Sequence, residues 1–416
     1  MGIDLWDKKP LKELCSRVGD GLHGTPVYDD TSEIFFINGN NLKNGKIEIT
    51  EGTNSIAEDE YQKNFIELDE NTLLLSINGT LGSMAFYNGE KIMLGKSAAY
   101  LNFKTRINCF YYYYFQLENV QKYFYNVATG STIKNLSLKS IQDFNVPLPK
   151  DKEWKVISKI LSAIDKKIDL NNRINIELEA MAKTLYDYWF VQFDFPNEQG
   201  KPYKSSGGKM VLNEALKREI PEGWEVDIIS NIIEVKDGTH DSPKPKETGY
   251  HLITSKNLKK EGLDFENANL ISEEDYENIN KRSKVESGDI LFSMIGSIGT
   301  VYNVDEKEVN FAIKNVALYK TSQKADYKNY LYTTLNSHYM KQYMGNVISG
   351  SIQKFIGLGA LREMPVLNNT IIINSFEKKT EHLFLNMSLI REENQQLTQL
   401  RDWLLPMLMN GQVTVR

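Results

Sequence analysis

The sequence has few cysteines and histidines and no long hydrophobic run. Only Cys15 and Cys109 occur among 416 residues. Two distant thiols indicate buried cysteines in a reducing cytoplasm rather than a disulfide scaffold. No run of about 18 apolar residues occurs, so we expect no membrane-spanning helix. The first ten residues carry charges where a secretion signal needs an apolar stretch. These absences predict a cytoplasmic protein without a membrane partner.

Signatures of catalysis are equally scarce. Gly89 and Gly95 stand before Lys96-Ser97, but five residues separate them where a phosphate-binding loop needs four. The stretch 357–362 begins like a dinucleotide fingerprint, yet Arg362 takes the place of its last glycine. Neither Asn-Pro-Pro-Tyr nor Asp-Pro-Pro-Tyr, typical of amino-methyltransferases, is present, and the five histidines lack metal-ligand spacing. We therefore expect no catalytic residue, no metal and no cofactor on this chain.

Overall charge gives only a weak indication of the partner. Apolar residues make up 41% of the chain and charged residues 25%, as in globular proteins. The net charge of −6 argues mildly against nucleic acid as a partner. An acidic protein can still present basic loops to DNA, and an acidic surface elsewhere can dock a basic partner.

Internal repetition is the most informative feature of the sequence. Three motifs recur in the same order, the first two 217 residues further on and the third 220. The pairs are Asp20-Gly21-Leu22-His23-Gly24-Thr25-Pro26 with Asp237-Gly238-Thr239-His240-Asp241-Ser242-Pro243, Ser76-Ile77-Asn78-Gly79-Thr80-Leu81-Gly82 with Ser293-Met294-Ile295-Gly296-Ser297-Ile298-Gly299, and Gly130-Ser131-Thr132-Ile133-Lys134 with Gly350-Ser351-Ile352-Gln353-Lys354. Asn41-Leu42-Lys43 also recurs as Asn257-Leu258-Lys259, and Lys96 matches Lys314. The period predicts a duplicated domain and a pseudo-two-fold molecule.

Each half divides into a globular part and a helical part. Short apolar runs that end in glycine-rich turns predict α/β or α+β domains at 1–150 and 222–370. Heptad-like patterns predict a central helix over 151–196 and a C-terminal helix over 371–416. The segment 197–221 begins with dense proline, glycine and serine, which predicts a flexible linker.

Apolar seams on the two helices predict that they pack together as antiparallel partners. One helix carries Ile157, Leu161, Ile164 and Ile168, then a second run of Ile174, Leu178, Met181 and Leu185, with an apparent break near Asn171-Asn172. The other carries Leu383, Met387, Ile390, Leu397 and Leu404, with Asn394 and Arg401 at two seam positions. A seam on one helix needs a partner, and a buried asparagine fixes register. The alternative is that each helix packs separately on its own domain.

Two repeated loops supply candidate contacts to DNA. In the Asp-Gly-x-His loop, histidine either contacts a phosphate or base edge or only bonds to the protein, and both interpretations stay open. The Gly-Ser-x-x-Lys loop combines backbone N–H groups, a hydroxyl and lysine, which favours phosphate contact. The candidates are His23, Lys43, Ser131, Lys134, His240, Lys259, Ser351 and Lys354.

A run of five aromatic residues, 111–115, could stack on bases. Aromatic residues also recur in the second half, at Tyr327, Tyr330 and Tyr332. This recurrence favours packing of a helix against its sheet, and we expect core residues here.

The chain resembles the specificity subunits of type I restriction-modification systems. The motif that carries this resemblance best is Tyr188-Trp189-Phe190-Val191-Gln192-Phe193-Asp194-Phe195-Pro196. The stretches Ile220-Pro221-Glu222-Gly223-Trp224-Glu225 and Leu404-Leu405-Pro406-Met407-Leu408-Met409-Asn410-Gly411 are similar too.

This resemblance implies two target-recognition domains held apart by two long antiparallel helices. Each domain would read half of a split double-stranded DNA site. The helices would dock two modification subunits that use S-adenosylmethionine, and two restriction subunits would add ATP- and Mg-dependent translocation and cleavage. The resemblance assigns no catalysis to this chain. The alternatives are a self-sufficient nuclease or methyltransferase and a coiled-coil scaffold that binds only protein.

Overall fold

Residues 6–259, 262–350 and 354–413 are described by the computed structural model. They belong to two units, Met1–Ile168 with Gln396–Arg416, and Asp169–Gln395. Each unit contains one domain, the first part of the long helix that follows that domain, and the last part of the other long helix. No helix in the described ranges is both long enough and apolar enough to cross a membrane.

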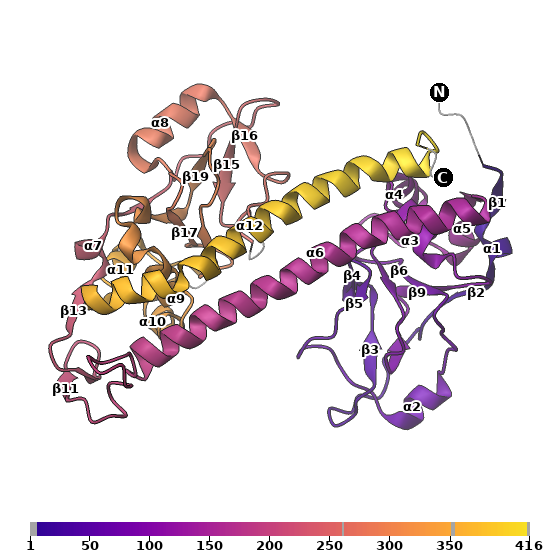
Figure 1. Ribbon diagram of the computed structural model, residues 1–416. Helices are drawn as coiled ribbons and strands as arrows, with labels where there is room; N and C mark the ends of the chain where they lie inside the picture. The colour runs from indigo at the N-terminus through magenta and orange to yellow at the C-terminus, as the bar shows by residue number, and fades with distance from the viewer. Residues whose placement is uncertain (1–5, 260–261, 351–353, 414–416) are drawn as a thin grey trace. The chain divides into compact units, whose positions relative to one another are not determined.

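The first domain is built on a four-stranded antiparallel sheet, shown in Figure 1. The strand order is β2 (Cys15–Asp20), β9 (Ala98–Phe103), β6 (Thr72–Ser76), β7 (Met84–Phe86). Three strand pairs complete it: parallel β3 (Phe35–Ile37) and β8 (Ile92–Leu94), antiparallel β4 (Leu42–Lys43) and β5 (Lys46–Ile47), and antiparallel β1 (Lys8–Pro10) and β10 (Asn145–Pro147). Its helices are α1 (Leu11–Leu14), α2 (Glu58–Lys63), α3 (Asn108–Phe115), α4 (Glu118–Val127) and α5 (Leu138–Gln142).

The second domain repeats this topology. The matching sheet has the order β14 (Val235–Asp237), β20 (Val316–Tyr319), β17 (Ile290–Ser293), β18 (Val301–Asn303). In the smaller sheet, β15 (Tyr250–Thr254) pairs parallel with β19 (Phe311–Lys314) and antiparallel with β16 (Asn269–Ile271). Strand β13 (Glu225–Ile228) pairs with β21 (Pro365–Asn368), and the helices are α7 (Ile229–Ile232), α8 (Glu273–Ser283), α9 (Lys328–Leu335), α10 (His338–Val347) and α11 (Leu358–Arg362).

The aromatic run lies in the core, as expected. Tyr111 and Phe115 of α3 are fully buried among the sheet and α4. The Tyr111 hydroxyl donates to the backbone oxygen of Pro147 over 2.8 Å. Tyr330 of α9 makes the equivalent bond to Leu367 over 2.7 Å. Both domains therefore use a buried tyrosine to join the helix after the sheet to the strand before the long helix, and neither ring is available to stack on a base.

The long helices α6 (Asp151–Tyr186) and α12 (Thr370–Met409) run antiparallel within each unit. In the first unit, Ile157 and Leu161 pack in one core cluster with Leu405 and Leu408. In the second unit, Asn171 contacts Asn394, while further along α6 the Tyr186 ring lies 6.2 Å from the Phe376 ring. The expected fold class of two mixed domains and two long antiparallel helices is confirmed.

The seam of α6 is continuous, which corrects the expected break. Its half-buried and buried positions follow each other at alternating spacings of four and three: Ile157, Leu161, Ile164, Ile168, Asn171, Asn175, Leu178, Ala182 and Leu185. Ile174 and Met181, placed on the seam from sequence, are exposed. Asn171 is buried and donates to Asn394 Oδ1 over 2.8 Å, while Asn394 donates to Asn172 over 2.8 Å. Asn171 thus occupies a seam position because Asn394 on the other helix satisfies it.

On α12, the apolar seam residues expected from sequence are all buried or half-buried. Met387 is buried, and Leu383, Ile390, Asn394 and Leu397 are half-buried. Three fully buried residues, Ile373, Phe376 and Thr380, extend the same spacing toward the start of the helix.

The stretch expected to be a flexible linker is an ordered part of the second unit. Tyr203 stacks on Phe195 with ring centroids 4.8 Å apart, and the Asp194 carboxylate accepts from the backbone N–H and hydroxyl of Ser205. A hairpin of β11 (Met210–Asn213) and β12 (Arg218–Pro221) follows. Glycine and serine here form turns that fold back onto the aromatic motif at 188–196. Four aromatic residues of that motif are buried: Trp189, Phe190, Phe193 and Phe195.

Candidate nucleic-acid interface

The repeated sequence motifs converge on one loop cluster in each domain. The first loop cluster consists of residues 20–26, 38–43, 76–82, 95–97 and 129–135. The second consists of 237–243, 254–259, 293–299, 313–315, 349–350 and 354–355. Hydrogen bonds and backbone bridges join the segments of each loop cluster.

In the first loop cluster, four contacts link the five segments. The Thr80 hydroxyl donates to Gly39 O over 2.7 Å, and Gly39 N donates to the Ser97 hydroxyl over 2.9 Å. The backbone N–H of Lys96 donates to Leu22 O over 3.0 Å. The turn at 76–82 forms a backbone bridge from Asn78 to Asn135. Segments more than 100 residues apart in sequence are therefore held together at one end of the domain.

The second loop cluster uses different residues for the same contacts. Ser297 donates to Ser255 O over 3.4 Å, and Ser255 donates to Asn315 O over 3.1 Å. Asn315 N donates to Thr239 O over 3.2 Å, and a backbone bridge joins Ile295 to Phe355. The arrangement is thus kept although most side chains have changed.

Glycine is required where each Asp-Gly-x-His loop meets the neighbouring strand. A Cβ added to Gly21 would lie 1.9 Å from Leu94 O, and one added to Gly238 would lie 2.2 Å from Ile313 O. Both distances are far below van der Waals contact, and the obstacles are backbone atoms. The glycine therefore lets the loop lie directly against the end of β8 or β19, which fixes the position of the histidine two residues later.

The two histidines differ in what they leave available to a ligand. His23 Nε2 lies 2.8 Å from the Asp20 carboxylate, and Nδ1 has no hydrogen-bond partner among the described residues. His240 Nε2 lies 2.9 Å from Asp237, and its Nδ1 lies 2.8 Å from Asn315 Oδ1. Both ring nitrogens of His240 are therefore used inside the protein. His23 therefore keeps one ring nitrogen for a phosphate or base edge, whereas the geometry at His240 favours a structural role.

Arg282 of α8 forms hydrogen bonds that stabilise the Asp-Gly-x-His loop of the second domain. Its guanidinium donates to the Asp237 carboxylate over 2.8 Å and to Gly238 O over 2.7 Å. Asp237 thus joins Arg282 to His240, and His240 continues the chain to Asn315. Phe65 lies at the corresponding sequence distance in the first half, so the first loop has no such brace from that position. Arg282 and Asn315 were not identified from sequence, because they lie 45 and 75 residues from their partners.

Of the other candidates, the lysines of the Asn-Leu-Lys motif have differing environments. Lys43 forms an ion pair with Glu48, and both side chains are about half exposed. Lys259 is exposed, and its backbone N–H donates to Gly262 O. The asparagine of the motif is structural, since Asn257 Oδ1 accepts from Thr254 N and Asn41 Oδ1 accepts from Asn38 N, each over 3.0 Å.

Backbone hydrogen bonds join the two ends of each Gly-Ser-x-x-Lys loop, between Thr129 and Asn135 and between Ser349 and Phe355. In the first loop, Gly130 has a φ of 102°. Ser131 is exposed, and Lys134 Nζ lies 5.0 Å from the centre of the Tyr125 ring. In the second, Lys354 is exposed, while Ser351 lies outside the described residues. Lys354 is therefore accessible for phosphate contact, whereas Lys134 is half-buried beside Tyr125.

One lysine in each loop cluster was matched from sequence but not assigned to the site. Lys96 and Lys314 both lie next to the Asp-Gly-x-His loop of their domain. Backbone hydrogen bonds join the segments 95–97 and 313–315 to that loop. Lys96 is exposed, and Lys314 bonds the Ser242 hydroxyl. Their repetition in the sequence was the signal that could have identified them.

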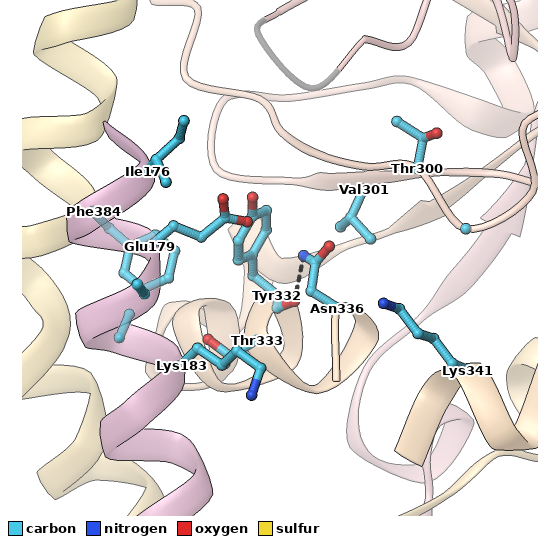
Figure 2. A pocket seen from close by; sticks show the side chains of 13 residues that line it. Ile176, Glu179, Lys183, Thr300, Val301, Tyr332, Thr333, Asn336, Lys341 and Phe384 are labelled. Atoms are coloured by element: carbon cyan, nitrogen blue, oxygen red, sulfur yellow. Dashed lines mark hydrogen bonds between the residues drawn. The ribbon is translucent and has the colours of Figure 1, made fainter. Parts of the chain in front are cut away.

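Each domain also has a hollow at an equivalent place. In the second unit, a cavity of about 490 Å³ lies beside α6 and is lined by Gly299, Thr300, Tyr332 and Asn336 among others. Figure 2 shows Tyr332 and Asn336 between side chains of α6 and those of Thr300 and Lys341. In the first domain, a hollow of about 270 Å³ is lined by the matching residues Gly82, Ser83, Tyr112 and Gln116. No group of three or more metal-ligating side chains occurs in the described ranges.

Comparison with known proteins places the chain in a family. The sequence profile described as "Type I restriction modification DNA specificity domain" matches residues 4–180 and 221–367. The chain therefore belongs to the family of type I restriction-modification DNA specificity domains. This agrees with the resemblance found in the aromatic motif.

Relatives extend the likeness over the whole chain. The type I restriction enzyme MjaIX specificity subunit of Methanocaldococcus jannaschii is 23% identical, over 99% of this chain and 94% of the relative. The MjaVIII specificity subunit of the same organism is 26% identical, over 84% of this chain and 81% of the relative. The crystal structure of an S subunit of a type I restriction-modification system from M. genitalium has a TM-score of 0.53 at 17% identity, and the match covers 97% and 96% of the two chains. This structure supports the fold.

Proposed function

We propose that this chain is the sequence-specific DNA-binding subunit of a type I restriction-modification complex, and that each domain reads one half of a bipartite site. The observation that carries the proposal is the duplicated loop cluster. Both copies keep one contact chain and accessible lysines, whereas the stretches 45–55 and 262–272 between the shared motifs differ in sequence. One scaffold with different inserts suits two half-sites of different sequence. Lysines on phosphates would supply affinity, and base edges in the major groove would supply discrimination.

The proposed complex also contains modification and restriction subunits. In this proposal the long helices dock two modification subunits, which use S-adenosylmethionine, and two restriction subunits use ATP and Mg. The chain itself binds none of these cofactors and performs no catalysis. Apolar side chains on the outer faces of both helices support docking. Leu170 and Met181 of α6 are exposed, and so are Leu389 and Leu400, which occupy the same places counted from the start of α12. Equivalent apolar positions on two helices suit two copies of one partner.

We further propose that the paired helices set the spacing between the half-sites. Tethering two readers raises affinity through effective concentration only when the spacer matches the DNA. Because the α6 seam is continuous, a change of length has to add a whole heptad to both helices at matching positions. Seven residues add about 10.5 Å at 1.5 Å per residue, which corresponds to about three base pairs.

The decisive experiment replaces residues 222–370 by the matching domain of a relative, in cells that also carry the modification subunit. Methylation-sensitive sequencing of the genome reads the recognised site. We expect one half-site to change and the other to stay. If both half-sites changed together, the domains would not read separately. If methylation were lost while the swapped chain still bound its partner and DNA, the proposed coupling of reading to modification would be wrong.

A further inference from the structure

The chain passes between two sheets at the same point in both domains, and a lysine stands at each crossing. Strand β8 pairs with β3, whereas the next strand, β9, belongs to the four-stranded sheet. Lys96 lies in the three-residue connection between them. In the second domain, Lys314 ends β19 and only Asn315 separates it from β20. The sheet ends on either side therefore hold the backbone of both lysines in place.

The backbone of the second crossing adopts an uncommon conformation. Asn315 adopts a φ of 53°, in the left-handed region that asparagine tolerates better than most residues. Its side chain faces His240 and its backbone oxygen accepts from Ser255. Such conformations persist where the surroundings over-determine them, and they gather at functional sites. The contacts of Asn315 hold the connection between β19 and β20 next to the histidine loop.

Each crossing combines a lysine with an aspartate that pairs with other residues. At the first, Lys96 is exposed and has no ion pair or hydrogen bond to its ammonium among the described residues, and Asp20 is occupied by His23. At the second, the one bond of the Lys314 ammonium within the described part of the chain goes to the neutral Ser242 hydroxyl, and Asp237 is paired with Arg282 and His240. Asp241 is the one further acid in that loop. Within the described ranges, neither lysine ammonium is therefore paired with a carboxylate.

We propose that Lys96 and Lys314 are matched contacts to DNA backbone phosphates, one in each domain. This inference rests on the proposed function and deepens it. Phosphate is favoured over a base edge because the flanking residues differ, Gly95 and Ser97 against Ile313 and Asn315, while the lysine is kept. Domains that read different bases share phosphates but not base edges. An ammonium on a flexible stem binds phosphate as a point charge and tolerates such changes around it.

The test measures how binding depends on salt. The full chain, purified with its modification subunit, is titrated onto a duplex that carries its methylated sequence and onto a scrambled duplex. For Lys96→Gln and for Lys314→Gln, we expect the slope of log affinity against log salt to fall by about 0.9, the value for one phosphate. Between about 50 mM and about 200 mM salt, each variant should lose about 3.5-fold less affinity than the parent. Both duplexes should be affected alike, and the double variant should show about twice the change.

Matched controls separate charge from folding. Lys91→Gln removes an exposed lysine just before β8, and Lys307→Gln one before β19; both should keep the parent slope. Lys96→Arg and Lys314→Arg keep the charge and should restore the slope. An unchanged slope in the glutamine variants, in a parent complex that binds DNA, would overturn this inference alone. If the glutamine variants lost affinity for the specific duplex only, the phosphate assignment would be overturned, and the lysines would instead contact bases. A parent complex that binds neither duplex would overturn the proposed function as well.

Discussion

The two domains place different chemistry at the same buried position of their sheets. In the first, Thr72 of β6 donates to Asn102 of β9 over 2.9 Å, a neutral pair. In the second, the Lys320 ammonium lies 2.6 Å from Asp289, with only 4% and 0% of the side chains exposed. Because the strand registers match, these pairs are equivalent. The sheet therefore accepts either pair, provided that both members are present to satisfy each other.

A second exchange of the same kind occurs on the long helices. In the first unit, Asp165 of α6 forms an ion pair with Arg401 of α12 over 3.0 Å and accepts from Tyr113 over 2.6 Å. The matching places in the second unit, counted from the start of each helix, hold Phe384 and Ala182, which are buried. The duplicated halves have thus diverged by replacing whole sets of partners while the backbone is retained. Changes to single members of these sets should therefore be more damaging than changes to whole sets.

Lys320→Met should cause the largest loss of stability. This change leaves the buried Asp289 carboxylate without its cation, and breaking a buried pair in this way typically destabilises a protein by about 3–5 kcal/mol. The matched control, D289T with K320N, transplants the neutral pair of the first domain and should recover most of the loss. Hydrogen exchange of the β17 amides measures the stability of this domain alone. If the double variant were as unstable as the single one, the two sheets would not be interchangeable at this position.

The two domains also differ in the residue of the long helix that contacts the start of α3 or α9. This difference should have a smaller effect on stability. Glu377 of α12 accepts from the backbone N–H groups of Asn329 and Tyr330, over 3.2 and 2.8 Å. The first half has Ser158 at the corresponding place. Burial raises the pKa of Glu377 to about 7 from an ordinary value of 4.5, against the lowering effect of those two bonds. Between these two pH values the folded chain holds a proton that the unfolded chain has released. The stability of the second domain should therefore fall as pH rises through this window, by up to about 3 kcal/mol.

Glu377→Gln tests this titration, since an amide cannot release the proton. Hydrogen exchange of the α9 amides at pH 5 and pH 8, corrected for the intrinsic rate, gives the stability at each pH. We expect the parent to lose more stability than the variant between the two values, because all other titrating groups are shared. Equal losses would show that Glu377 does not titrate in this window.

The sequence was sufficient to predict the duplication and the fold class, because repeated motifs and heptads are local signals. It misplaced part of the α6 seam for a physical reason. Ile174 and Met181 were chosen as apolar, yet heptad spacing brings Asn171 to the inner face, where Asn394 satisfies it. Inserting residues at Asn171-Asn172 would therefore disrupt hydrogen bonds to Asn394. The histidines could not be told apart from sequence, since Asn315 and Arg282 reach His240 and its loop only through the fold.

The smallest expected effect is on the salt dependence of DNA binding and concerns the Gly-Ser-x-x-Lys loops. The two domains are most similar in these loops. Lys134 lies over the Tyr125 ring, whereas Gly345 stands at the matching place in the second domain. If both lysines contact phosphate, Lys134→Ala and Lys354→Ala should each lower the salt slope of binding by about one. The loss should be equal for specific and scrambled duplexes. Neither lysine side chain is buried in the core, so the melting temperature should hardly change. A salt slope that stayed at the parent value while the protein lost stability would show that these lysines are structural. A reduced slope for Lys354→Ala only would indicate that stacking on Tyr125 keeps Lys134 away from the DNA, which Tyr125→Gly would then reverse.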